Sequence, residues 1–165
     1  WEPYDVPRKK VITHAEQTEK YLYFVIGGAQ RIYYTSENDK ESTLILTYPY
    51  SFGGVLDSFL LQKPSNYYYE SLSPSVFLRV PHEKFVEVTD KTPSLDKLIK
   101  QHTYQALTGL LARMVELQSF SSEDKFRALL KRSPHILQLV PHKYLANYLG
   151  IDATNFSKLI NTLKI

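Results

Sequence analysis

At 165 residues, with 43% hydrophobic and 22% charged residues, the chain has the balance of a globular protein that forms one average domain or two small ones. It contains no cysteine, which excludes a disulfide framework, a cysteine nucleophile, a thiolate zinc site and a cysteine-bound iron–sulfur cluster. The net charge is only +3.

The charge is unevenly distributed along the chain. Residues 1–93 hold ten Lys and Arg against twelve Asp and Glu, whereas residues 121–165 hold seven against three. The segment between them, residues 94–120, holds three against two. A basic end predicts a polyanionic partner such as nucleic acid, although well-solvated basic helices give the same composition.

The sequence lacks the apolar segments of a membrane or secreted protein. No run reaches the roughly 18 apolar residues of a membrane span, and the opening WEPYDVPRKK lacks the apolar core of a signal peptide. We therefore expect a cytoplasmic protein with no membrane span. Because the chain begins at Trp1 rather than Met, we also expect a further segment before it.

Up to about residue 80, the pattern is typical of short strands. Tyr21–Ile26 and Arg31–Thr35 are rich in aromatic and β-branched residues and flank Gly27-Gly28-Ala29-Gln30, where glycine suits a turn. Further strands are predicted at Ser42–Tyr48, Asn66–Leu72 and Val76–Val80. Strands at this spacing indicate an antiparallel sandwich or roll.

The pattern becomes helical after Pro81. A short helix is predicted over His82–Thr89, and Thr92-Pro93 is a start signal with a capping hydroxyl before proline. The next 26 residues, 94–119, contain no proline, and their apolar residues cover more than one stripe of a helix. A second copy of the helix would cover the extra stripe, so we expect a homodimer through residues 94–120. The alternative is a helix buried within one large core.

The last 45 residues begin with a new helix start. Ser121 and Asp124 have the spacing of a capping box, and the helix that follows ends before Pro134. The segment Phe120–Ser122 is the expected hinge between two domains.

Residues 141–164 have the pattern of a helix-turn-helix. Small Ala146 allows two helices to cross closely, Gly150 provides the turn, and Ile151 fills their interface. Asp152 caps the second helix, whose buried face is Phe156, Leu159 and Ile160. The open side is then polar and suits a DNA major groove: it consists of Ala153, Thr154, Asn155, Ser157, Lys158 and Asn161. An ordinary helical hairpin is the alternative.

These motifs resemble one known family. SPHILQLVPHKYLANYLGIDATNFSKL resembles the C-terminal segment of Crp/Fnr regulators, and YLYFVIGGAQRIYY resembles the strand–Gly–strand element of their cyclic-nucleotide-binding-like domain. The resemblance spans nearly the whole chain in the same order. It implies an α+β fold with an N-terminal antiparallel β-roll sensor domain (1–93), a long dimerisation helix (94–120) and a C-terminal winged helix-turn-helix (121–165). It also implies a dimeric transcription regulator that binds palindromic double-stranded DNA and responds to a small-molecule effector.

The effector segment departs from this resemblance. Cyclic-AMP-binding relatives have a Glu for the ribose and an Arg for the phosphate; Gly54 and Ser65 stand at those positions here, and no arginine lies between Arg31 and Arg79. This argues against cyclic AMP and leaves the effector unidentified. Six residues are the expected effector pocket: Gly53, Gly54, Val55, Ser65, Asn66 and Tyr67. Strand tyrosines that merely pack are the alternative for Tyr67 and its neighbours.

Enzymatic and metal-dependent functions find no support in the sequence. The five histidines lack ligand spacing, and we find no catalytic constellation, no metal site and no cofactor motif. Three hypotheses follow: an effector-responsive DNA-binding regulator, a module of the same fold that has lost DNA binding or ligand control, and a small enzyme or carrier that uses the β-roll cavity. The first is the one that we expect. Lys158 is the leading candidate for a DNA contact, followed by Thr154 and Asn155, whereas Ala153 and Thr154 replace the base-reading Arg or Glu of known relatives.

Overall fold

The computed structural model describes residues 1–162 and contains two compact units. The first comprises residues 1–85 with 139–141, and the second comprises residues 86–138 with the described residues from His142 on. The boundary lies inside helix α2 (His82–Lys91). None of the helices within residues 1–162 is long and apolar enough to cross a bilayer.

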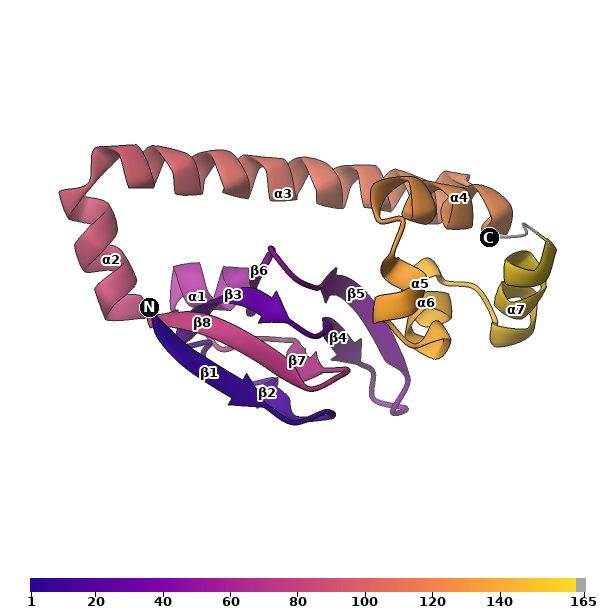
Figure 1. The fold of residues 1–165 in the computed structure, drawn as a ribbon, viewed down its shortest axis with the longest axis horizontal. Helices are drawn as coiled ribbons and strands as arrows, with labels where there is room; N and C mark the ends of the chain where they lie inside the picture. Colours follow the sequence, from indigo (N-terminus) through magenta and orange to yellow (C-terminus); the bar gives the residue numbers. More distant parts are fainter. Residues whose placement is uncertain (163–165) are drawn as a thin grey trace. The chain divides into compact units, whose positions relative to one another are not determined.

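The first unit is a roll of two four-stranded antiparallel sheets (Figure 1). One sheet has the order β1-β8-β3-β6, with strands Glu2–Val6, Ser75–Pro81, Tyr21–Gly27 and Phe52–Gly53. The other has the order β2-β7-β4-β5, with strands Val11–Thr13, Tyr68–Ser71, Gln30–Thr35 and Glu41–Thr47. The antiparallel β-roll and the five strands expected from residue 21 onward are therefore confirmed.

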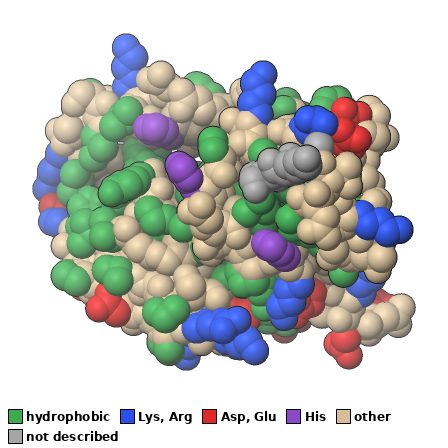
Figure 2. Space-filling model, turned by 45° about the vertical axis from the view of Figure 1, so that its right-hand side comes forward, with side chains coloured by type: hydrophobic (Ala, Val, Ile, Leu, Met, Phe, Trp, Pro, Cys, Tyr) green, Lys and Arg blue, Asp and Glu red, His purple; other side chains and the backbone are tan. Residues whose placement is uncertain are grey.

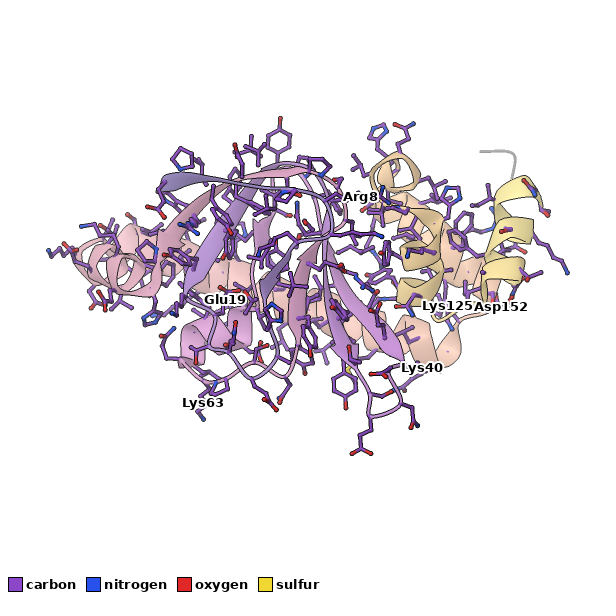
Figure 3. All side chains as sticks on the ribbon, turned by 90° about the horizontal axis from the view of Figure 1, so that it is seen from below. Arg8, Glu19, Lys40, Lys63, Lys125 and Asp152 are labelled. Atoms are coloured by element: carbon purple, nitrogen blue, oxygen red, sulfur yellow. The ribbon has the colours of Figure 1, made fainter. Side chains whose placement is uncertain are left out.

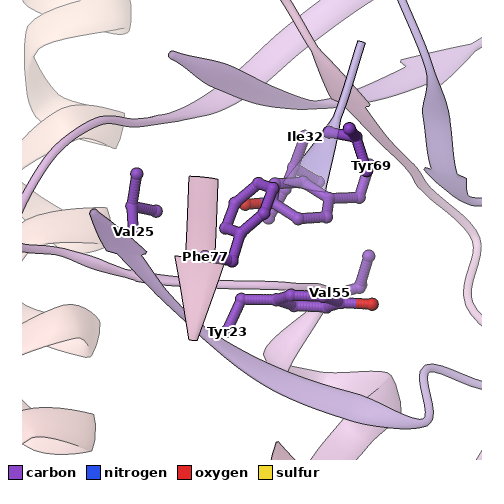
Figure 4. Close-up of a cluster of buried hydrophobic side chains, with 7 residues drawn as sticks. Tyr23, Val25, Ile32, Val55, Tyr69 and Phe77 are labelled. Carbon is purple, nitrogen blue, oxygen red and sulfur yellow. The ribbon is translucent and has the colours of Figure 1, made fainter. Parts of the chain in front are cut away.

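The core of the roll lies between its two sheets. Buried rings of Tyr23, Tyr69 and Phe77 gather there with aliphatic side chains such as Val25 and Ile32 (Figure 4). Alternation along each strand turns these residues inward, and the rings meet edge-on or tilted at centroid distances of 5.4 to 6.4 Å. A short helix, α1 (Leu56–Leu61), follows β6 and buries Phe59.

The second unit is helical. Its helices are α3 (Pro93–Ser119), α4 (Ser122–Arg132), α5 (Ile136–Leu139), α6 (His142–Leu149) and α7 (Ala153–Thr162), and only the last residue of α5 falls in the first unit. Ser121 caps α4 as expected, since its hydroxyl oxygen accepts the backbone N–H of Asp124 at 3.1 Å. The cap expected from Thr92 is wrong: its side chain makes no capping hydrogen bond, and Pro93 alone marks the start of α3.

The contacts place α3 in the same unit as α4–α7, so Phe120–Ser122 lies inside the helical unit. The division of the chain into a sensor domain, a dimerisation helix and a DNA-binding domain, with boundaries at residues 93 and 120, stays a prediction. Any wing of the helix-turn-helix would follow Thr162 and lies outside the described residues, as does Lys164.

Candidate functional sites

The glycines at the expected effector pocket are required by their surroundings. Gly54 has a φ of +96°, a conformation that L side chains rarely adopt. At Gly53, a Cβ would lie 2.3 Å from the phenol oxygen of Tyr69, so no side chain fits while Tyr69 holds its place. The sequence Phe52-Gly53-Gly54-Val55 therefore makes room for a tyrosine from the opposite sheet.

Tyr69 fills this part of the roll with its own polar group. Its side chain is fully buried, its Oη lies 3.3 Å from Thr47 Oγ1, and the backbone of Gly54 hydrogen-bonds the same oxygen. Burial raises the pKa of Tyr69 above its ordinary value of 10, although the hydrogen bonds with Thr47 and Gly54 oppose the shift. The phenol is thus a neutral, satisfied group within the glycine segment.

Ser65 is also satisfied within its own loop. Its hydroxyl donates to the backbone oxygen of Tyr67 at 2.8 Å and accepts the backbone N–H of Tyr67 at 2.8 Å. Asn66 is exposed, and Tyr67 is half-buried against the core cluster that contains Val55. Of the six expected pocket residues, Gly53, Gly54, Val55 and Ser65 are buried.

Glu19 is a functional candidate that the sequence did not reveal. Its carboxylate accepts hydrogen bonds from Thr13 Oγ1 at 2.6 Å, from the Tyr21 N–H at 3.2 Å and from the Val55 N–H at 3.3 Å. It lies inside the roll (Figure 3) and is only 2% exposed. Burial raises the pKa of Glu19, and these neutral donors oppose the shift without cancelling it. Nothing in the sequence separates this carboxylate from the other acidic residues.

The helix-turn-helix geometry matches the expectation for α6 and α7. Gly150 has a φ of +64° in the turn, and the N–H of buried Ile151 donates to the Ala146 oxygen at 3.0 Å. Asp152 lies at the start of α7 (Figure 3), and its carboxylate accepts the Asn155 N–H at 2.8 Å. Buried Phe156 then packs edge-on against Phe126 of α4, with ring centroids 5.3 Å apart.

The open side of α7 is polar and exposed. At about 100° per residue, Thr154, Lys158 and Asn161 lie opposite Phe156, and all three are exposed. Ala153 and Ser157 are exposed too, whereas Asn155 is half-buried at the flank. The Ser157 hydroxyl donates to the Ala153 oxygen at 2.9 Å, so its proton is engaged by the helix.

A buried ionic cluster holds this motif to the end of α3. Arg113 and Glu116, 7% and 6% exposed, form an ion pair of 3.2 Å, and Arg132 of α4 donates to the same carboxylate. The Arg113 guanidinium lies 4.1 Å over the Tyr148 ring and also donates to the Tyr148 oxygen in α6. The cluster therefore joins α3, α4 and α6. The sequence does not reveal it, because apolar periodicity does not mark buried charges.

The basic groups of the helical unit are dispersed. Arg127 pairs with Glu123 and Arg132 with Glu116, whereas Lys158 makes no ion pair with a described residue. Figure 2 colours Lys and Arg side chains blue, and on the face that it shows several of them have Asp or Glu side chains next to them. Within residues 1–162, no three His, Cys, Asp or Glu side chains gather as metal ligands would.

Comparison with known proteins agrees with this architecture. Residues 5–92 match the model of the cyclic nucleotide-binding domain family. No significant match to a curated protein sequence was found.

Solved structures resemble nearly the whole chain. FixK2 from Bradyrhizobium japonicum is similar with a TM-score of 0.88 and 15% identity, over 99% of this chain and 84% of that one. TTHA1359, a CRP/FNR-family transcriptional regulator from Thermus thermophilus, is similar with a TM-score of 0.70 and 22% identity, over 99% and 86%. The c-di-GMP-responsive regulator CLP from Xanthomonas campestris gives 0.71 and 15%, over 99% and 86%. These structural similarities show that the chain has the fold of the Crp/Fnr regulators. Because the family model covers more than half of the sequence, the chain belongs to the cyclic nucleotide-binding domain family.

Proposed function

We propose that the protein is a homodimeric regulator that binds palindromic double-stranded DNA through α7 and is not controlled by cyclic AMP. The observation that supports this best is the α6–α7 pair, with a buried Phe156 side and an exposed polar side, in a chain with the fold of Crp/Fnr regulators. A helix of this kind enters the major groove as the second element of a helix-turn-helix.

Exposed apolar residues on α3 support the homodimer. Leu107, Leu110, Met114 and Leu117 are 43% to 56% exposed, and their spacing of three, four and three residues is that of a coiled-coil seam. Such a stripe is stable in water when a second copy covers it. A two-fold pair of this chain then presents two copies of α7 to one duplex.

The chemistry around Gly54 argues against cyclic AMP. A cyclic phosphate needs a cation or several free donors, but Ser65 is bonded within its loop and Tyr69 occupies the space beside Gly53. Calorimetry with cyclic AMP should therefore give no saturable heat in the micromolar range. Tight, saturable binding to the unaltered protein would contradict this part of the proposal. A small effector, if the roll binds one, is less charged.

Selection from randomised duplexes with the intact protein tests DNA binding. We expect a roughly palindromic site with half-sites about one helical turn, ~34 Å, apart. Lys158→Ala should weaken binding. If the slope of the logarithm of the binding constant against the logarithm of the salt concentration then falls by about one in magnitude, Lys158 contacts a phosphate. If instead the sequence preference is relaxed at one position of the site, Lys158 contacts a base. Lys63→Ala, which alters an exposed lysine of the β-roll (Figure 3), is the matched control. Absence of any enriched site would contradict the proposal.

Sedimentation tests the dimer separately. The unaltered protein should sediment as a dimer at micromolar concentration, and Leu110→Glu with Met114→Glu should give monomers because charges then lie in the apolar seam. Gln101→Glu and Gln105→Glu add the same charges to exposed polar positions of α3 and should leave the dimer intact. A monomeric parent protein would contradict the homodimer.

A further inference from the structure

The base-facing side of α7 has almost no charge, which limits the bases that it can recognise. Thr154, Lys158 and Asn161 form its centre, with Ser157 beside them, and α7 contains no arginine over Ala153–Thr162. Guanine presents two acceptors, N7 and O6, in the major groove, and the side chains that pair with both are Arg and Lys. Only Lys158 meets that requirement here.

The remaining side chains are suited to A·T pairs. The exposed amide of Asn161 makes no hydrogen bond with a described residue, and an asparagine amide both donates to adenine N7 and accepts from adenine N6. The methyl groups of Ala153 and Thr154 suit the C5-methyl group of thymine. The Ser157 hydroxyl already donates to the Ala153 oxygen, so toward a base it offers only an acceptor, which both adenine N6 and cytosine N4 can use and which therefore does not distinguish the two base pairs.

We infer that α7 selects an A·T-rich half-site, with an adenine opposite Asn161, thymine methyl groups against Ala153 and Thr154, and at most one guanine, at Lys158. Residues 153 to 161 span ~12 Å along the helix axis at 1.5 Å per residue. That length covers three to four base pairs at about 3.4 Å each. This inference rests on the proposed function, because it assumes that α7 enters the major groove.

Base analogues in the selected duplex test the inference directly. Replacing the contacted thymines by uracil removes only the methyl group and should weaken binding several-fold. Replacing the adenine opposite Asn161 by 7-deazaadenine removes one acceptor and should weaken binding about tenfold, in the range of a bidentate contact. Analogues at non-contacted spacer positions should leave affinity unchanged.

Variants of Asn161 provide the second arm. Asn161→Ala should abolish the preference for adenine at one position of each half-site, and Asn161→Arg should convert it to a preference for guanine. Both changes lie on the exposed face, so the melting temperature should not move. Asn38→Ala, at an exposed asparagine of a β-roll turn outside the expected effector pocket, is the matched control and should leave the selected sequence unchanged.

The outcomes separate the inference from the function on which it rests. Failure to enrich any duplex would overturn the proposed function. A selected half-site rich in G·C pairs would overturn the inference while DNA binding stands. An A·T-rich site that is indifferent to uracil and to both Asn161 variants would overturn it as well, because DNA shape would then explain the preference.

Discussion

Among the described residues, each of the two units buries one carboxylate. The carboxylate of the β-roll is surrounded by neutral hydrogen-bond donors, and that of the helical unit by positive charges. In the β-roll, Glu19 meets only neutral donors, the Thr13 hydroxyl and the N–H groups of Tyr21 and Val55. In the helical unit, Glu116 meets two guanidinium groups, those of Arg113 and Arg132. Burial acts on both, so the difference between their pKa directions shows what the surrounding partners contribute.

The pKa of Glu19 is raised because burial outweighs its neutral hydrogen bonds. Burial would raise the pKa of Glu116 too, but the hydrogen bonds and charges of Arg132 and Arg113 outweigh it, and the pKa is lowered. The roll therefore uses a carboxylate as a hydrogen-bond acceptor that organises a loop. The helical unit uses one as the counter-charge that joins three helices.

The largest effect should follow the loss of the helical counter-charge. Glu116→Gln leaves Arg113 buried without an anion, so the free energy of unfolding of the helical unit should fall by about 3 kcal/mol. Chemical denaturation followed by circular dichroism at the helix band measures this. Glu123→Gln breaks the exposed pair with Arg127 on α4 and should cost less than about 1 kcal/mol. Equal losses in the two variants would contradict the comparison.

Removing the carboxylate of the roll should have the next largest effect. Glu19→Ala leaves the N–H groups of Tyr21 and Val55 without their acceptor, which should cost about 2 kcal/mol. The sole tryptophan, Trp1, lies against Phe52 in the roll, so its fluorescence follows this unit. Glu37→Ala, at an exposed turn of the same unit, is the control and should be nearly neutral. A loss confined to the helical signal would be inconsistent with this assignment.

Acidification should shift the two units in opposite directions. A raised pKa means that Glu19 contributes stability that is fully present below its ordinary value of 4.5 and is lost as pH rises through its folded-state value, so this contribution to the roll is regained as pH falls through that value. A lowered pKa means that Glu116 contributes stability above its ordinary value of 4.5, which is lost as pH falls through its folded-state value. Unfolding should be measured at several values from pH 7 to pH 3, by tryptophan fluorescence for the roll and by circular dichroism for the helical unit. The stabilities that the two signals report should diverge as pH falls. The divergence should shrink in Glu19→Gln and in Glu116→Gln.

The smallest effect concerns the turn glycine of the helical unit. Gly150→Ala places a methyl group 3.7 Å from Leu117 Cδ2, which is ordinary contact, so only the left-handed backbone costs free energy, about 1 kcal/mol. Gly54→Ala in the roll adds close approaches of 3.1 Å to the Tyr21 oxygen and to Tyr23 Cδ2. Thermal unfolding should therefore show a larger loss for Gly54→Ala, and the reverse order would contradict this interpretation of the two turns.

Local pattern was enough to predict the elements whose residues alternate or cap in sequence. Strands such as Tyr21–Gly27 and the caps at Ser121 and Asp152 are of this kind. Strand β1 was not predicted, because Glu2, Pro3 and Asp5 are poor strand formers and pair only through β8. Helix α1 is too short for a periodic signal.

The candidate sites were predictable to the extent that they depend on neighbours in sequence. The exposed side of α7 follows from helical spacing, so Thr154, Lys158 and Asn161 were found in advance. Glu19 and Tyr69 contact the Gly53–Val55 segment from distant parts of the chain, and only the folded roll brings them together. Arg113 and Glu116 gave no signal because charged residues at helical spacing ordinarily face solvent.

A Cβ at position 53 would lie 2.3 Å from the phenol oxygen of Tyr69, so the residues at positions 53 and 69 constrain each other in evolution. A glycine at 53 is mandatory only while position 69 holds a ring with a para-hydroxyl, and a smaller residue at 69 would free position 53 to accept a side chain. The two positions should therefore change together among homologues, with glycine paired to tyrosine and larger residues at 53 paired to aliphatic ones at 69.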